Sequence, residues 1–183
     1  MAARTLPPIA TLNSLSADEF TLALGPLFEN APTFLAALAA GRPFASYDAL
    51  WPAGLEIARA MPEDAKVELI DAHPRLGAQP ASVSAMSFRE QGYGATGARV
   101  PGVAQAAGGE RSADAVAAEL DRLNQAYEAR FGFRYCVFVN GRSRAELIAG
   151  MAAALEADRA AEIERALGEI VAIAESRSRA LIT

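Results

Sequence analysis

The feature that most restricts the fold of this chain is an imbalance between helical and strand-like patterns. Apolar residues recur at helical spacing along most of the sequence, and only residues 133–139, Phe-Arg-Tyr-Cys-Val-Phe-Val, have the composition of a strand. A single strand has no partner with which to form a sheet. The sequence therefore predicts an all-α fold, a multi-helix bundle that contains one short extended segment.

Local signals indicate where the helices begin and end. Ser16 and Ser143 are each followed by glutamate three residues later, which is the pattern of a capping box. Proline at the start of a helix and glycine after its end mark further boundaries. The expected helices run from Ser16 to Phe28, from Pro32 to Gly41, from Pro62 to His73, from Val116 to Phe131, after Ser143 and after Asp158. A turn at Arg42-Pro43-Phe44 leads into a segment that contains Tyr47 and Trp51.

Length and composition limit the class of protein. With 183 residues, of which 52% are hydrophobic, the chain suits one domain over residues 1–183. A net charge of −5 argues against binding to nucleic acid or to an anionic membrane surface, and no apolar run approaches the roughly 20 residues of a membrane span. Cys136 is the single cysteine, which fits a reducing compartment, and we expect a cytoplasmic location.

His73 is the one imidazole available for acid or base chemistry near neutral pH. Pro74 disfavours the helical conformation at His73, so the preceding helix should end there. A helix C-terminus favours the protonated imidazole by roughly 0.3 to 1 kcal/mol when it is exposed. The simpler alternative is that His73 is a packing or capping residue.

Three other features each allow a structural and a functional interpretation. Ser87-x-x-Glu90, followed by Gln91, matches a capping box, but its residues would also suit a ligand at a helix N-terminus. The segment from Tyr135 to Val139 is a buried core stretch, or its peptide groups bind a planar, amide-rich ligand. Arg177, at the end of an apolar stripe, either extends to solvent or binds an anion.

Two further predictions concern metals and a loop. One histidine and one cysteine cannot supply a typical zinc site, and no cluster of carboxylates suits a hard cation, so we expect no metal. Glycines recur from Gly92 to Gly109, which indicates a long loop.

Four motifs together resemble the OHCU decarboxylase family, over about Leu12 to Arg177. They are His73-Pro74-Arg75-Leu76-Gly77, Ser87-x-x-Glu90-Gln91, Leu123-Asn124-x-x-Tyr127 and Phe131-Gly132-Phe133. The resemblance implies an all-helical, cofactor-free and usually dimeric enzyme of urate breakdown. Such enzymes convert 2-oxo-4-hydroxy-4-carboxy-5-ureidoimidazoline (OHCU) to (S)-allantoin.

The resemblance also assigns roles to residues. His73 would be the catalytic acid or base, and Glu90 would hydrogen-bond either His73 or the substrate hydroxyl. The substrate would contact Pro74, Ser87, Gln91, the segment Tyr135, Cys136, Val137, Phe138 and Val139, and Arg177. Two rival functions remain: a non-catalytic helical module that binds a ureide or a protein partner, and a related hydrolase or isomerase.

Overall fold

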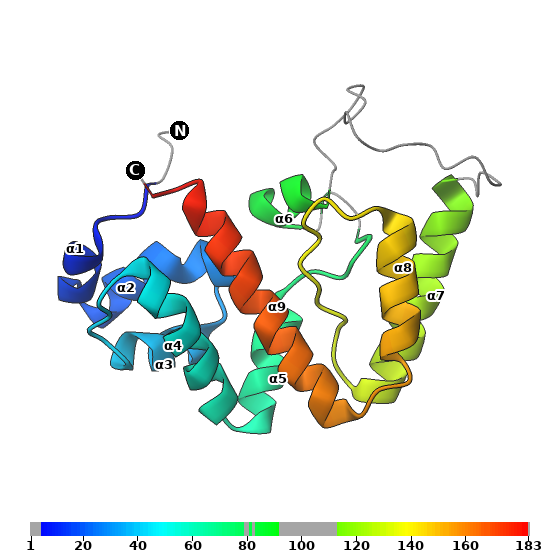
Figure 1. Ribbon diagram of the computed structural model, residues 1–183, viewed down its shortest axis with the longest axis horizontal. Helices are drawn as coiled ribbons and strands as arrows, with labels where there is room; N and C mark the ends of the chain where they lie inside the picture. The colour runs from blue at the N-terminus through cyan, green and yellow to red at the C-terminus, as the bar shows by residue number, and fades with distance from the viewer. Residues whose placement is uncertain (1–4, 79–80, 82, 92–112, 183) are drawn as a thin grey trace. The chain divides into compact units, whose positions relative to one another are not determined.

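The computed structural model describes residues 5–78, 81, 83–91 and 113–182 (Figure 1). Helices dominate this part of the chain, and its sole β-type pairing is an isolated bridge between Leu6 and Ile182. The all-α prediction is therefore confirmed. The elements are α1 (Ile9–Ser14), α2 (Ala17–Leu24), the 3-10 helix η1 (Gly25–Phe28), α3 (Pro32–Ala40), α4 (Tyr47–Ala60), α5 (Glu63–Ala72), α6 (Ala85–Glu90), α7 (Ala113–Phe131), α8 (Arg144–Ala154) and α9 (Arg159–Arg179).

The chain divides into two compact units, each built from segments that are separated in sequence. The first unit contains Met1–His73, Cys136–Phe138 and Ala160–Thr183, and the second contains Pro74–Tyr135 and Val139–Arg159. The path of the chain therefore passes between the units four times. The prediction of a single domain over residues 1–183 stays a prediction.

In the first unit, α3 packs against α2, α4 and α5. The side chains at its contact face are apolar and buried, among them Phe34, Leu35 and Leu38. The phenyl rings of Phe28 and Phe34 meet edge to face, with centroids 4.8 Å apart. The Leu6 N–H donates to the Leu181 carbonyl at 2.8 Å, which ties the first described residues to the turn that follows α9 (Figure 1).

In the second unit, α7 and α8 lie side by side (Figure 1). The C-terminal end of α7 contributes Tyr127 and Phe131 to an aromatic cluster with Phe133 and Tyr135. Gly132 adopts a φ of +77°, which lets the chain leave the helix and return along this cluster. All four aromatic residues are buried, so they form part of the core of this unit.

The capping boxes predicted at Ser16 and Ser143 are confirmed. In α2 the Ser16 hydroxyl accepts from the Glu19 N–H, and the Glu19 carboxylate accepts from the Ser16 N–H; Ser143 and Glu146 do the same in α8. The prediction of one continuous helix from Ser16 to Phe28 is wrong in detail, because α2 ends at Leu24 and η1 continues with a tighter winding. Pro26 has no N–H to donate to an α-helical bond, which favours this change.

The described residues include the segment before α8 and all the helices that could be compared with a membrane span. Residues 134–139 belong to no helix and no strand, and Figure 1 shows this part of the chain as a drawn-out coil. None of the described helices is both long enough and apolar enough to cross a membrane. The predicted loop from Gly92 to Gly109 lies outside the described residues.

Candidate functional site

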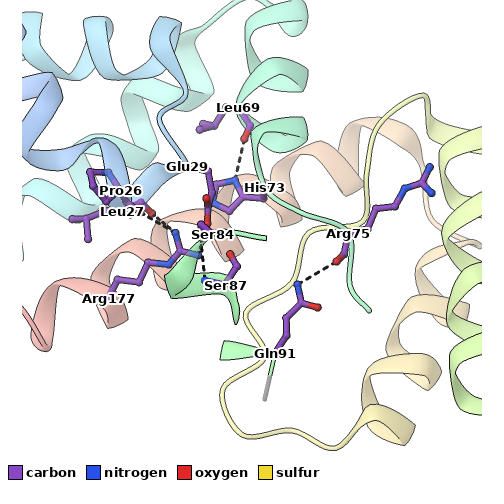
Figure 2. Close-up of polar contacts among 10 residues, drawn as sticks. All are labelled: Pro26, Leu27, Glu29, Leu69, His73, Arg75, Ser84, Ser87, Gln91 and Arg177. Atoms are coloured by element: carbon purple, nitrogen blue, oxygen red, sulfur yellow. Dashed lines mark hydrogen bonds and ion pairs between the residues drawn. The ribbon is translucent and has the colours of Figure 1, made fainter. Parts of the chain in front are cut away.

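His73 occupies the position at which α5 ends. Its backbone has φ −77° and ψ 140°, the extended conformation expected before proline, and its side chain is 3% exposed. The His73 N–H donates to the Ile70 carbonyl at 3.1 Å, so the Leu69 carbonyl does not receive the backbone bond that a continuing helix would give it. The imidazole Nδ1 lies 3.2 Å from this Leu69 carbonyl oxygen (Figure 2).

This contact determines which nitrogen of His73 can exchange a proton. A carbonyl oxygen only accepts, so Nδ1 must carry a hydrogen to make the bond. Nε2 therefore holds the lone pair of the neutral imidazole and carries the second proton of the imidazolium. The predicted capping role is confirmed, and it fixes the ring so that proton transfer at Nε2 leaves the bond to Leu69 intact.

The turn after His73 is held by the side chain of Gln91. Gln91 Nε2 donates to the Arg75 carbonyl at 3.2 Å (Figure 2). The Gly77 N–H in turn donates to Gln91 Oε1 at 2.9 Å. Gly77 has a φ of +79°, and a Cβ atom there would lie 3.2 Å from the Leu120 side chain. Glycine therefore allows both the left-handed turn and its close approach to α7.

Two side chains on one face of α7 hold the same turn. Asn124 is 2% exposed, and its Nδ2 donates to the Leu76 carbonyl at 3.0 Å. One helical turn later, Glu128 forms an ion pair with Arg75. Residues four apart on a helix lie on the same side, so one stripe of α7 contacts both Arg75 and Leu76. Asn124 belongs to a motif of the predicted family, but the sequence alone did not indicate this contact.

The predicted capping box at Ser87-x-x-Glu90 is wrong. Helix α6 begins at Ala85, and the Ser87 N–H donates to the Ser84 hydroxyl at 3.2 Å, so Ser84 caps the helix (Figure 2). Ser87 is the third residue of α6 and is buried, and Glu90 is its last residue. Ser84 has Ser87 and not a glutamate three residues later, so the capping-box pattern favoured Ser87 although Ser84 is the cap.

The extended segment that was predicted to contact substrate is bound along one side by α9. Arg165 donates through NH1 to the Cys136 carbonyl at 2.9 Å, and the Phe138 N–H donates to the Glu169 carboxylate at 2.7 Å. Arg165 is itself held by Glu162, which is 3% exposed and accepts from its Nε at 2.9 Å. Side chains of a helix thus take the place of a neighbouring strand for part of this segment.

The side chains at the start of this segment are core residues. The Tyr135 ring lies edge to face with Tyr127, with centroids 5.1 Å apart, and it is 5% exposed. The Cys136 side chain is equally buried, whereas Val137, Phe138 and Val139 are half-buried. Any substrate contact at Tyr135 or Cys136 would therefore involve the backbone more readily than the side chain.

Arg177 is buried, so the interpretation that it extends to solvent is wrong. Its NH1 donates to the Pro26 and Leu27 carbonyls at 3.2 and 3.1 Å, and its NH2 pairs with the Glu29 carboxylate at 2.8 Å (Figure 2). Glu29 has a φ of 51° and ends η1, whose final carbonyls lack helical partners. The guanidinium therefore caps η1, and the anion that it binds in this structure is Glu29.

The predicted site residues are distributed over both compact units. The first unit contains His73, Cys136, Val137, Phe138 and Arg177; the second contains Pro74, Ser87, Glu90, Gln91, Tyr135 and Val139. Within the second unit the structure brings Gln91 onto the turn that begins at Pro74. Convergence of all these residues on one substrate, including the contact of Glu90 with His73, stays a prediction.

Sequence comparison identifies the family. The family model described as OHCU decarboxylase matches residues 13–179. The uric acid degradation bifunctional protein PucL of Bacillus subtilis (strain 168) is 32% identical over 172 residues, which are 94% of this chain but 32% of that protein. This chain thus spans about a third of the bifunctional relatives that it matches. The 2-oxo-4-hydroxy-4-carboxy-5-ureidoimidazoline decarboxylase of Amia calva is 28% identical over 93% of this chain and 92% of its own.

Two solved structures share the fold. The crystal structure of (S)-allantoin synthase has a TM-score of 0.66 and 20% identity, and the match covers 96% of this chain and 54% of that one. The structure of OHCU decarboxylase in the presence of (S)-allantoin has a TM-score of 0.58 and 22% identity, with 82% and 91% of the two chains covered. Because the family model covers most of its length, this chain belongs to the OHCU decarboxylase family.

Proposed function

We propose that this protein converts OHCU to (S)-allantoin, with His73 as the group that transfers the proton. The observation that carries the proposal is the match of the family model to residues 13–179. The geometry of His73 agrees with it, because an imidazole fixed through Nδ1 to the Leu69 carbonyl can exchange a proton at Nε2.

The reaction suits a protein that supplies position and one proton. When the bond to the carboxylate carbon breaks, carbon dioxide leaves and the electron pair moves into the adjacent ring imine of the substrate. This internal electron sink makes pyridoxal, thiamine or a metal unnecessary. The intermediate then takes up one proton, and delivery to a single face produces the S configuration.

The other predicted site residues bind the substrate and orient it. Glu90 hydrogen-bonds either His73 or the substrate hydroxyl. Ser87, Gln91 and the backbone of Tyr135 to Val139 orient the ring and the ureido amides, and Pro74 and Arg177 complete the contacts. The Gln91 amide carries both donors and acceptors, which suits the alternating donors and acceptors of a ureide. Orientation of this kind lowers the entropic part of the barrier.

We also infer a cytoplasmic homodimer. The location is supported by the single cysteine, which is buried and suits a reducing compartment. The dimeric state is supported by the family resemblance. Analytical ultracentrifugation at several protein concentrations tests it, and a sedimentation coefficient of a monomer at all concentrations would reject it.

Circular dichroism during a coupled reaction tests the activity. Urate oxidase and hydroxyisourate hydrolase generate OHCU from urate, and the protein is then added. We expect optically active allantoin to form faster than in its absence. Formation of racemic allantoin at the spontaneous rate would reject the function, and NMR of the product separates a decarboxylase from a hydrolase or isomerase.

A further inference from the structure

The extended segment 136–138 runs parallel to α9 and pairs with two of its side chains. Arg165 and Glu169 are four residues apart, and their partners Cys136 and Phe138 are two residues apart. Neighbouring helical side chains at this separation lie about 5–6 Å apart. Two residues of extended chain span roughly 6.6 Å, which is similar. One stripe of α9 therefore has the spacing needed to pair with an extended chain.

This pairing has a consequence for Val137. In an extended chain the N–H and C=O groups of one residue point to one side, and those of the next residue point to the other. The Cys136 carbonyl and the Phe138 N–H face α9. The N–H and C=O groups of Val137 therefore face away from α9. Among the described residues they form no hydrogen bond, and Val137 is half-buried.

We propose that Arg165 and Glu169 are positioning residues that hold segment 136–138 so that the donor and acceptor of Val137 face the ureide substrate. The inference rests on the proposed function. An N–H and a C=O on the same side match the alternating acceptors and donors of a planar ureide. Glu162 assists because it fixes the Arg165 guanidinium from one turn earlier on α9.

Glu169 is a better residue to substitute than Arg165. Removal of Arg165 would leave the buried carboxylate of Glu162 without its ion pair and would destabilise the fold. Glu169 accepts the Phe138 N–H through a carboxylate oxygen, a bond that the amide oxygen of glutamine can also make. Glu169→Gln should therefore preserve the position of the segment, and Glu169→Leu should release it.

The experiment measures steady-state kinetics with OHCU and amide hydrogen exchange of Phe138 in the full chain. For Glu169→Leu we expect a KM raised about tenfold to hundredfold, as for loss of a hydrogen bond to a charged group, while kcat changes much less. The Phe138 amide should exchange faster. Glu169→Gln should restore both values, and thermal unfolding verifies that each variant is folded.

Glu164→Leu is the matched control. Glu164 is also on α9 and pairs with Arg59, but its side chain is 46% exposed and has no bond to the segment. This variant should keep the KM and the Phe138 exchange of the unaltered protein. If Glu169→Leu does not fold, Glu169→Ala provides the same comparison without added bulk.

The outcomes separate this inference from the proposed function. An unchanged KM in Glu169→Leu, with faster exchange at Phe138, would overturn the positioning role. Equal exchange at Phe138 in all variants would overturn it whether or not the protein is active. Failure of the unaltered protein to form allantoin would overturn the proposed function, while the exchange data would still show whether Glu169 holds the segment.

Discussion

At the scale of single residues, His73 combines a structural and a chemical task. Its Nδ1 satisfies the Leu69 carbonyl at the end of α5, and the same bond sets the ring orientation. Histidine can do both because its two nitrogens are separate groups on one rigid ring. A capping role and a catalytic role are therefore compatible at this residue.

Replacement of His73 by asparagine separates the two tasks. The asparagine amide retains an N–H donor for the Leu69 carbonyl but has no titratable nitrogen. We expect kcat to fall by about 10² to 10⁴, the usual contribution of general acid–base catalysis. Urea denaturation should show a folded protein. An unchanged rate together with an unchanged enantiomeric excess would contradict the role of His73.

Asn124 carries a second prediction at this scale, concerning stability. Asn124→Leu removes the donor to the Leu76 carbonyl, and both residues are buried. An unpartnered buried carbonyl costs about 1–3 kcal/mol of unfolding free energy. Urea denaturation measures the loss. Gln125→Leu, at the next and exposed residue of α7, is the control and should stay within about 0.5 kcal/mol of the unaltered protein; equal stability of both variants would contradict the prediction.

At the scale of elements, most helix boundaries follow from local chemistry and were predictable. The caps at Ser16 and Ser143, the start at Pro32 and the end at His73 each depend on a few adjacent residues. Helix α1 was missed because it has six residues, and Leu12 is the only buried one among them. So short a helix has no periodic pattern, and its stability comes from tertiary packing.

The contacts of the candidate site were less predictable because they join residues far apart in sequence. Glu169 and Phe138 are 31 residues apart, and Asn124 and Leu76 are 48 apart. Residue types and motif spacing indicated that the extended segment needs partners for its peptide groups. They did not indicate that charged side chains of α9 supply two of them, since an arginine and a glutamate four apart are equally typical of an exposed helix face.

The capping box of α8 gives a prediction that depends on pH. Hydrogen bonds from the Ser143 side chain and then from its backbone N–H hold the pKa of Glu146 below its ordinary value. A lowered carboxylate pKa stabilises the folded protein above the unfolded pKa, and this contribution is lost as the pH falls through the folded pKa. Ser143→Ala should cost about 1 kcal/mol at neutral pH.

The difference in unfolding free energy between this variant and the unaltered protein should shrink as the pH falls through the lowered pKa of Glu146, because the carboxylate then becomes protonated. Urea denaturation of both proteins at several pH values measures it. Ser14→Ala is the control, because the Ser14 hydroxyl donates to a backbone carbonyl and contacts no carboxylate. A difference for Ser143→Ala that does not change with pH would show that Glu146 has no part in the cap.

At the scale of the whole molecule, contacts between distant segments hold the first compact unit together. Its parts are contributed by Met1–His73, Cys136–Phe138 and Ala160–Thr183. The bond between Leu6 and Leu181 and the contacts of Arg177 with η1 join its first and last parts. The stability of this unit should therefore depend strongly on the few polar residues that make these connections.

Arg177→Met tests this dependence. The change leaves the buried Glu29 carboxylate without its ion pair and two carbonyls of η1 without their donor. Breaking one side of a buried ion pair costs about 3–5 kcal/mol of unfolding free energy. Urea denaturation should show this loss in Arg177→Met, followed by partial recovery in Arg177→Met with Glu29→Gln, because a neutral amide costs less to bury than a carboxylate.

The neighbouring Arg179 provides the matched control for Arg177. Arg179 pairs with Glu175 on the same helix, but its side chain is 74% exposed, and such a pair contributes about 0–1 kcal/mol. A loss in Arg177→Met no larger than in Arg179→Met would contradict the structural role. Arg177→Lys separates stability from substrate contact, because lysine keeps the charge but not the planar set of donors. A raised KM in a stable Arg177→Lys protein would support a substrate contact in addition to the cap on η1.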